Sequence, residues 1–239
     1  MQIFAHRGYS GKFPENTMVA FKAVLDYEIE GVELDVHMTK DGQLVVIHDK
    51  KVNRTTNGKG YVSEMKLDEI KQLDAGSWFN PLFKGERIPT LEEVLKLYQH
   101  KNLRVNIELK SEELPYCGMD MKVVKLVEEL GMSKQVILSS FDHETLYRIS
   151  QVAPQLEIAP LLSNLIISPW KYTKDLSASA MHISGYYMQR QAAIKAIEQG
   201  VIIRVYTINT KDHFKMCQKA NVAAIFTDEI EAAIEWRKG

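Results

Sequence analysis

Cysteine is scarce in this chain of 239 residues, in which Cys117 and Cys217 are the only two. Two cysteines are too few for a disulfide framework or a zinc cluster, and they fit a reducing compartment. A surplus of one charge is also lacking, since 30 basic residues stand against 31 acidic ones. Without a basic surplus or a polybasic cluster, the sequence favours neither nucleic acid nor an anionic membrane as a partner.

Long apolar runs are missing as well. None approaches the roughly 20 residues that cross a bilayer, so we expect no stable membrane anchor. The first predicted strand begins at Gln2, which leaves no room for a signal peptide, and the expected location is therefore cytoplasmic. With 45% hydrophobic residues, the chain can bury the core of one domain that spans residues 1–239. The sequence leaves open whether that domain forms a homodimer.

Short runs rich in β-branched residues alternate with longer amphipathic stretches, which favours βα units and a parallel sheet. The predicted strands are Gln2–Ala5, Gly31–His37, Arg104–Leu109, Gln135–Ser139, Glu157–Leu161, Ala180–Ser184, Ile202–Thr207 and Ala224–Thr227. Eight such units in a chain of this length predict a TIM (βα)8 barrel, with its active site at the carboxyl ends of the strands. An open doubly wound sheet fits the pattern too, but no Gly-rich phosphate loop follows the first strand.

One segment breaks the alternation. Thr39-Lys40-Asp41-Gly42 is a turn signal between two strand-like runs, so Leu44–Ile47 is expected to return antiparallel beside Glu33–His37. The stretch of residues 49–88 is polar and contains glycine, but it also contains Trp78, Phe79 and Phe83, too many aromatics for a disordered linker. We expect a distorted barrel with a β-hairpin and a small insertion over its carboxyl-terminal mouth.

Charged residues two positions apart stand at the ends of two predicted strands. Glu33 and Asp35 share one face of the first, and Glu108 and Lys110 share one face of the other. Buried carboxylates need a counter-charge, since desolvated like charges resist joint ionisation. One divalent cation held by Glu33, Asp35 and Glu108 meets that need. A ligand set of oxygens alone suits a hard ion, Mg²⁺ or Ca²⁺.

Cationic and imidazole groups complete a site for a phosphate ester. Arg7 can grip a phosphate through its planar fork, and Lys110 can act on it as a point charge. Cleavage of a P–O bond requires one proton to be removed and another to be delivered, which two histidines, His6 and His48, can do near neutral pH. The sequence does not tell which histidine is the acid and which is the base.

The chain resembles the glycerophosphodiester phosphodiesterases, of the bacterial cytosolic type, along nearly its whole length. The matching landmarks are, in chain order, His6-Arg7-Gly8, Pro14-Glu15-Asn16-Thr17, Glu33-Leu34-Asp35-Val36, Val46-Ile47-His48-Asp49, Arg54-Thr55-Thr56, Ile88-Pro89-Thr90-Leu91-Glu92-Glu93-Val94, Asn106-Ile107-Glu108-Leu109-Lys110, Ser139-Ser140-Phe141 and Thr227-Asp228. The resemblance implies a distorted TIM barrel with an insertion after the hairpin, and a metal-dependent hydrolysis of a small glycerophosphodiester to glycerol 3-phosphate and an alcohol such as choline, ethanolamine or glycerol. It assigns the metal to the three carboxylates named above, acid–base work to His6 and His48, and the phosphodiester to Arg7 and Lys110.

For several other residues the sequence gives less support for a place in the site. Glu15 is expected to support it from outside the ligand set, and so is His37. Tyr206 stands where the family often has tryptophan, and it still offers an aromatic wall and a hydroxyl. His182 fits either the core or the site, whereas His143 is expected to be solvated. A catalytically silent phosphodiester sensor and a lysophospholipase D-like enzyme remain the alternative functions.

Overall fold

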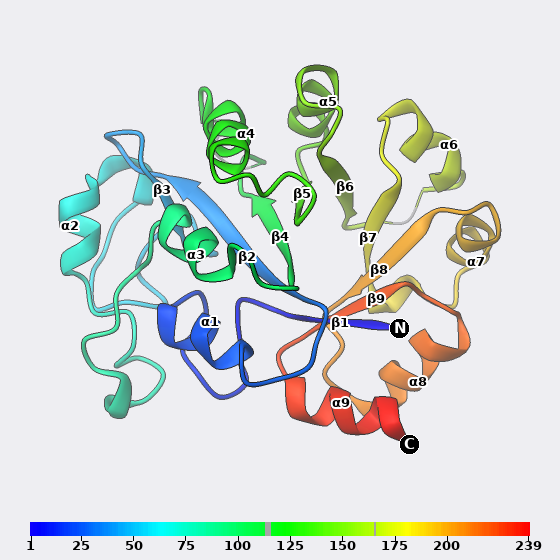
Figure 1. Cartoon of the computed structure of the whole chain (residues 1–239), viewed down its shortest axis with the longest axis horizontal. Helices are drawn as coiled ribbons and strands as arrows, with labels where there is room; N and C mark the ends of the chain where they lie inside the picture. Colours follow the sequence, from blue (N-terminus) through cyan, green and yellow to red (C-terminus); the bar gives the residue numbers. More distant parts are fainter. Residues whose placement is uncertain (113–115, 165) are drawn as a thin grey trace.

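The computed structural model describes residues 1–112, 116–164 and 166–239, and its centre is a closed parallel β-barrel (Figure 1). The sheet has nine strands in the order β1-β9-β8-β7-β6-β5-β4-β2-β3, and a further pairing of β1 with β2 closes it. Because β3 (Leu44–Val46) lies outside that closure, eight strands form the barrel. They are β1 (Gln2–Ala5), β2 (Gly31–Met38), β4 (Arg104–Leu109), β5 (Val136–Ser140), β6 (Glu157–Leu162), β7 (Ala180–Ser184), β8 (Ile202–Tyr206) and β9 (Ala224–Thr227). The predicted TIM barrel is confirmed.

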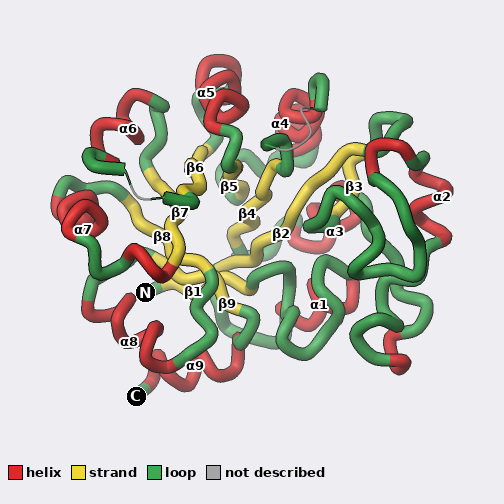
Figure 2. Tube along the Cα trace, turned by 180° about the vertical axis from the view of Figure 1, so that it is seen from behind, coloured by secondary structure: helices red, strands yellow, loops and turns green. Residues whose placement is uncertain are grey.

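Helices surround the barrel on its outside, as both views show (Figures 1 and 2). One helix follows nearly every strand: α1 (Met18–Val24), α3 (Leu91–Tyr98), α4 (Met119–Glu129), α5 (His143–Val152), α6 (Pro169–Asp175), α7 (Gln191–Glu198), α8 (Lys211–Lys219) and α9 (Ile230–Lys238). A single turn, η3 (Gly185–Tyr187), precedes α7. No helix of the described residues has the length and apolarity needed to cross a bilayer.

Local signals explain where several helices begin and end. Thr90 caps α3, because its hydroxyl accepts from the Glu93 amide while the Glu93 carboxylate accepts from the Thr90 amide. Gly131 and Gly200 lie just after the ends of α4 and α7, and their φ values of +67° and +84° are ones that glycine adopts readily. The Thr17 side chain caps α1, whereas the side chain of its neighbour Asn16 donates to Asp35. A polar residue with a partner in the site is not available as a cap.

Successive side chains of each strand point to opposite faces of the barrel wall, so the strands separate an outer apolar layer from an inner one. Residues such as Ile3, Leu34 and Ile107 belong to the large core between the strands and the helices. The alternating positions point into the barrel, where a second cluster consists of Phe4, Ile137, Ala159, Ala180, Ala224 and Phe226. Gly31 makes room for this inner cluster, since a Cβ at that position would lie 2.3 Å from the Phe4 ring. The inner cluster fills the barrel beneath the carboxyl-terminal ends of the strands, and polar side chains occupy those ends.

The predicted hairpin is present, with Val36 opposite Val46 in an antiparallel pairing of β2 and β3. The chain then forms η1 (Val62–Glu64), α2 (Leu67–Gln72) and η2 (Pro81–Phe83) before α3 begins. These segments bury a small core of their own, around Val52, Val62 and Ile70. They lie to one side of the barrel, next to β3 (Figure 1). Phe83 contacts Phe13 of the loop after β1, with ring centroids 5.6 Å apart, so the segment packs beside the mouth.

His182 belongs to a buried polar layer beneath the mouth. Its Nε2 lies 3.3 Å from Nη1 of Arg204, and Arg204 in turn donates to Glu157 at 2.5 Å. Arg104 donates to the other oxygen of Glu157 at 2.7 Å. Burial, with Arg204 and Arg104 nearby, keeps the pKa of His182 well below its usual value. Both alternatives from the sequence hold in part, because this neutral imidazole packs in the core and lines the floor of the cavity described next.

Candidate active site

A cavity of about 200 Å³ opens at the carboxyl ends of the barrel strands. Charged and imidazole groups line one side of it, among them His6, Arg7, Glu33, His48, Glu108 and Lys110. Apolar and aromatic groups line the other side, namely Phe141, Leu161, Tyr206 and Phe226. A cavity with this division binds a small molecule that has one strongly polar end.

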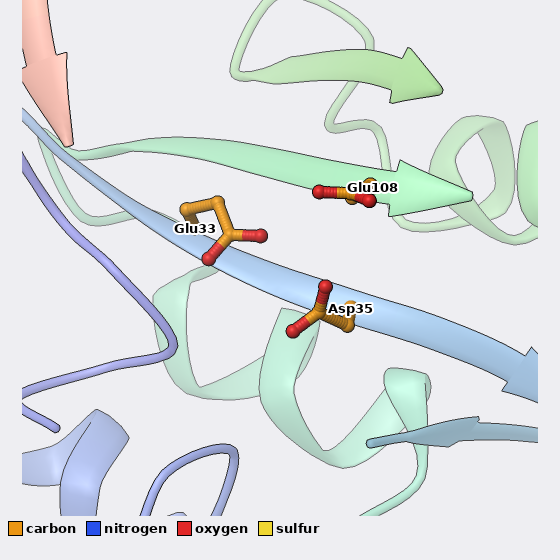
Figure 3. A group of neighbouring side chains, drawn as sticks. All are labelled: Glu33, Asp35 and Glu108. Atoms are coloured by element: carbon orange, nitrogen blue, oxygen red, sulfur yellow. The ribbon is translucent and has the colours of Figure 1, made fainter. Parts of the chain in front are cut away.

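Three carboxylates meet across neighbouring strands. Glu33 and Asp35 project from β2 and Glu108 from β4, and Figure 3 shows their carboxylates turned toward one another. Asp35 is paired with Glu108 in the parallel register of the two strands. One oxygen from each of the three lies within 4.8 Å of the others. The structure therefore brings together all three residues that the sequence nominated as metal ligands.

Two cations lie against this cluster. Lys110 forms ion pairs with Glu108 and with Asp35, the second at 3.3 Å. Arg7 has its Nε 3.4 Å from Asp35 Oδ2, and its main-chain amide donates to Glu33 Oε2 at 2.9 Å. Burial favours protonation of Asp35, but Lys110 and Arg7 outweigh it and hold the pKa of Asp35 below its usual value. Burial and the Asp35 charge instead raise the pKa of Glu33 well above its usual value. Two cations thus leave three carboxylates incompletely balanced.

The donor set fits a hard cation. Among the described residues, Glu33 Oε1, Asp35 Oδ1 and Asn106 Oδ1 are buried oxygens without a hydrogen bond, although Lys110 Nζ lies 3.3 Å from Asp35 Oδ1. Buried polar atoms are nearly always hydrogen-bonded. The oxygens of Glu33 and Asp35 that lack a hydrogen bond belong to the same carboxylate cluster, and they therefore indicate a missing partner. Carboxylate and amide oxygens without sulfur or imidazole are typical ligands of Mg²⁺ and Ca²⁺. Glu33, Asp35 and Glu108 are the residues that could hold such an ion.

Both predicted histidines line the cavity, and each is held by an aspartate. His6 Nδ1 lies 2.7 Å from Asp228 Oδ1, and His48 Nδ1 lies 2.7 Å from Asp49 Oδ1. Because a carboxylate can only accept, each Nδ1 carries a proton and each Nε2 is the nitrogen left for proton exchange. Hydrogen bonds from Arg54 lower the pKa of Asp49 to about 2. Despite its burial, Asp228 also has a pKa of about 2, because His6, Ser10 and Asn209 donate to it.

A chain of ion pairs connects the two halves of the mouth. Arg7 Nη1 donates to Glu15 Oε1 at 2.8 Å, and Arg54 also donates to the Glu15 carboxylate. Arg54 reaches Asp49 as well, at 2.8 Å from its Nε. Burial would favour protonation of Glu15, but the two arginines lower its pKa below the usual value. Glu15 thus lies outside the carboxylate cluster and is bonded to Arg7.

His37 and Tyr206 contribute contacts at the edge of the cluster. His37 Nε2 donates to the His48 carbonyl at 3.0 Å, and its Nδ1 accepts from the Tyr116 hydroxyl at 2.9 Å. Burial lowers the pKa of His37 to about 4, so the ring is neutral and fixes the main chain at His48. Tyr206 packs edge-on against Phe141 as an aromatic wall. Its hydroxyl donates to the Leu162 carbonyl at 3.0 Å and is occupied there.

The aspartate partners of the two histidines were not predicted from the sequence. Asp49 and Asp228 belong to the motifs that carry the family resemblance, but no role was predicted for them. The same is true of Asn16 and Arg54. Because Asp49 directly follows His48, the sequence could have predicted it as the partner of that imidazole. The expectation that His143 is solvated was wrong: it lies at the start of α5 over β6, bonded to the Tyr172 hydroxyl at 2.6 Å and the Leu161 carbonyl at 2.8 Å.

Comparisons with known proteins identify the family of the chain. The sequence profile of the glycerophosphoryl diester phosphodiesterase family matches residues 6–232. A glycerophosphodiester phosphodiesterase of Caldanaerobacter subterraneus is 41% identical over 99% of this chain and 98% of its own.

Solved structures give the same picture. A crystal structure of a glycerophosphodiester phosphodiesterase from Agrobacterium tumefaciens shares 34% identity over 95% of this chain and 96% of its own, with a TM-score of 0.83. A phosphodiesterase of Oleispira antarctica, solved in complex with the product sn-glycerol-3-phosphate, shares 27% identity over 100% of this chain and 97% of its own, with a TM-score of 0.90. The chain belongs to the glycerophosphoryl diester phosphodiesterase family and is therefore a phosphoric diester hydrolase.

Proposed function

We propose that this protein hydrolyses small glycerophosphodiesters to glycerol 3-phosphate and an alcohol, with a divalent cation and two histidines. One observation carries the proposal: a cluster of three carboxylates lies in the same cavity as two imidazoles, each oriented by an aspartate. A chain that only senses phosphodiesters has no need for two histidines of fixed tautomer beside a cluster of carboxylates.

Glu33, Asp35 and Glu108 would hold the cation, Mg²⁺ or Ca²⁺. When bound, such an ion supplies Lewis-acid stabilisation of phosphoryl charge and orients the ester. Arg7 and Lys110 bind the remaining phosphoryl oxygens. Glu15 restrains Arg7, and the side chain of Lys110 is about nine-tenths buried between its two carboxylates. Both cations are therefore positioned before substrate arrives, which avoids reorganisation during the reaction.

The positions of the two histidines support a separate role for each. A second cavity, lined in part by His48 but not by His6, adjoins the first. In an in-line displacement, the entering and leaving oxygens lie on opposite sides of phosphorus. We place the glycerol against the aromatic wall, with His6 taking the proton of its 2-hydroxyl as that oxygen bonds to phosphorus. As the bond to the alcohol breaks, His48 gives a proton to the leaving oxygen.

The second half of the reaction reverses these roles. Water enters from the side that the alcohol has left, and His48 takes its proton as the water oxygen bonds to phosphorus. The bond from phosphorus to the glycerol 2-oxygen breaks, and His6 returns a proton to that oxygen. Each histidine ends in its starting state, and glycerol 3-phosphate is released.

The test is release of glycerol 3-phosphate from glycerophosphocholine, measured with a coupled dehydrogenase assay. We expect release that stops after exhaustive chelation and returns with Mg²⁺ or Ca²⁺. Appearance of choline phosphate would mean that the other P–O bond is cut, and an unchanged rate after chelation would contradict the role of the cation. A substrate that lacks the 2-hydroxyl should be inert, whereas its normal turnover would favour direct attack by water.

The cellular setting completes the proposal. Cys117 and Cys217 are both free thiols, which fits the expected cytoplasmic location. Sedimentation equilibrium of the purified chain would decide whether it forms a homodimer, which the sequence left open.

A further inference from the structure

The loop after β8 contacts the aspartate that orients His6. Asn209 lies in this loop, shortly after β8 ends at Tyr206, and Asp228 follows directly after β9. β1, which leads to His6, pairs with β9, and β9 pairs with β8. Side chains at the carboxyl ends of these three neighbouring strands therefore meet at the mouth of the barrel, although they are distant in the sequence.

Asn209 binds the segment around Asp228 through three hydrogen bonds. Its Nδ2 donates to Asp228 Oδ2 at 2.6 Å. Its Oδ1 accepts from the main-chain amide of Asp228 at 3.0 Å and from the Thr227 hydroxyl at 3.1 Å. The side chain can be placed in one orientation only, because a main-chain amide must donate and a carboxylate can only accept. Asn209 thus holds both the main chain and the carboxylate of Asp228.

No other described side chain supplies the same contact. Among the residues that the structure describes, Asn209 Nδ2 is the one donor to Asp228 Oδ2. The other oxygen, Oδ1, lies 2.7 Å from His6 Nδ1 and 2.8 Å from the Ser10 hydroxyl. Ser10 has a single proton and lies 2.7 Å from the His6 carbonyl as well, so two acceptors share it. Because the last torsion of an aspartate is soft, the carboxylate would turn more freely without Asn209.

Asn209 has no direct place in the substrate cavity. The same loop contributes Tyr206 and Thr207 to the described residues that line the first cavity, but Asn209 is not among them. Its side chain is exposed beside the mouth. Any effect of Asn209 on the reaction must therefore pass through Asp228 and His6.

We propose that Asn209 is a positioning residue for proton transfer, which holds Asp228 against His6 Nδ1 and so leaves His6 Nε2 free to accept a proton. This inference rests on the proposed function, in which His6 takes the proton of the glycerol 2-hydroxyl. An amide suits this place because it donates to a carboxylate without adding charge. A second carboxylate would instead repel Asp228, since like charges at this distance resist joint ionisation.

The experiment compares two variants, with release of glycerol 3-phosphate from glycerophosphocholine as the readout. Asn209→Asp keeps the shape of the side chain and one accepting oxygen, but at about pH 8 its carboxyl is ionised and repels Asp228. We expect kcat to fall by about 10–100-fold, as on loss of other supporting contacts, and KM to stay within about twofold. Asn209→Ala leaves an exposed place where water can donate, so kcat should fall less than about tenfold.

The order of the two variants separates positioning from a merely structural role. If Asn209 only shaped the loop, the nearly isosteric Asn209→Asp would be the milder change. Asn102→Asp is the matched control, because Asn102 is an exposed asparagine just before β4, at the opposite end of the barrel. A smaller loss of kcat in Asn209→Asp than in Asn209→Ala, or an equal loss in Asn102→Asp, would overturn the proposal.

Nitrogen NMR of the imidazole side chains gives a second measurement that needs no turnover. The signals of His6 are identified by their loss in His6→Gln. The wild type should carry the His6 proton on Nδ1, and Asn209→Asp should lose this preference; an unchanged tautomer in that variant would contradict the positioning role. Absence of hydrolysis by the wild type would contradict the proposed function and leave the NMR comparison intact, so the two failures are distinguishable.

Discussion

Arg54 donates two hydrogen bonds to Glu15, from Nη1 to Oε2 and from Nη2 to Oε1, both at 2.8 Å. The same guanidinium donates two more to Asp49, from Nε at 2.8 Å and Nη2 at 2.9 Å. Asp49 orients His48, and Glu15 restrains Arg7. One planar side chain of the insertion thus positions His48, the proposed proton donor, and Arg7, the proposed phosphate ligand, through their acidic partners.

The first prediction concerns this bridge. Arg54→Lys keeps the positive charge but cannot form two paired sets of hydrogen bonds, because an ammonium is a point donor. Loss of such supporting contacts typically costs about 10–100-fold in activity, and we expect kcat/KM for glycerophosphocholine to fall by this amount. Arg87→Lys, at an exposed position of the same insertion, should change kcat/KM less than twofold. Equal effects of the two variants would mean that Arg54 has no positioning role.

The second prediction concerns the carboxylate cluster. Glu33→Gln and Glu108→Gln keep the shape of the side chain but remove the charge that would hold the cation. Stabilisation by a metal is worth several kcal/mol, so kcat should fall by at least about 10²–10³-fold. Calorimetric titration with Mg²⁺ or Ca²⁺ should show weakened binding in both variants. His48→Ala should lose activity and bind the ion as the wild type does; weakened binding in that variant would argue against separate roles for the two groups.

The structure also shows which parts of this site could be read from the sequence. Glu33 with Asp35, and Glu108 with Lys110, were visible because residues two apart share a face of a strand. Their meeting depended on β2 lying beside β4, although β3, α2 and α3 intervene in the chain. The parallel-barrel prediction supplied that adjacency in general form. The register that pairs Asp35 with Glu108 needed the structure.

Asp228 lay beyond what local patterns reveal. It is 222 positions from His6, and only the pairing of β9 with β1, which helps to close the barrel, brings the two together. His143 shows the opposite error, because an imidazole in a helical segment was expected to face water. The first turn of α5 lies over the end of β6, where the Leu161 carbonyl needs a donor, and His143 provides it. Such pairings depend on tertiary packing that no periodicity encodes.

The third prediction concerns Asp228 and proton transfer. Asp228→Asn can donate to His6 Nδ1 and so favours the tautomer with the proton on Nε2, which removes the base from the cavity. General acid–base catalysis contributes about 10²–10⁴-fold, and kcat should fall within that range. Binding of Mg²⁺ or Ca²⁺, measured by calorimetry, should stay unchanged. A loss of activity of less than about tenfold would show that His6 does not depend on this partner.

The fourth prediction follows from the pKa of Asp228, which is about 2 in the folded protein and about 3.9 in an unfolded chain. A carboxyl with a lowered folded pKa stabilises the fold above its unfolded pKa, and this contribution is lost as the pH falls through the folded value. The unfolding midpoint of the wild type should therefore exceed that of Asp228→Asn near pH 6. The gap should close from about pH 4 to about pH 2. Asp26→Asn, at an exposed position, is the control and should show no such closing gap.

The fifth prediction separates the two parts of Tyr206. Its ring lines the first cavity, whereas its hydroxyl is already bonded to the Leu162 carbonyl. Tyr206→Phe should therefore keep KM for glycerophosphocholine within twofold, while the free energy of unfolding falls by about 0.5–1.5 kcal/mol, the net worth of one hydrogen bond. Tyr206→Ala removes the wall and should raise KM about tenfold or more, since a buried aromatic contact is worth more than about 1.4 kcal/mol. If Tyr206→Phe raised KM as much as Tyr206→Ala does, the hydroxyl would have to bind the substrate, contrary to the hydrogen bond that occupies it.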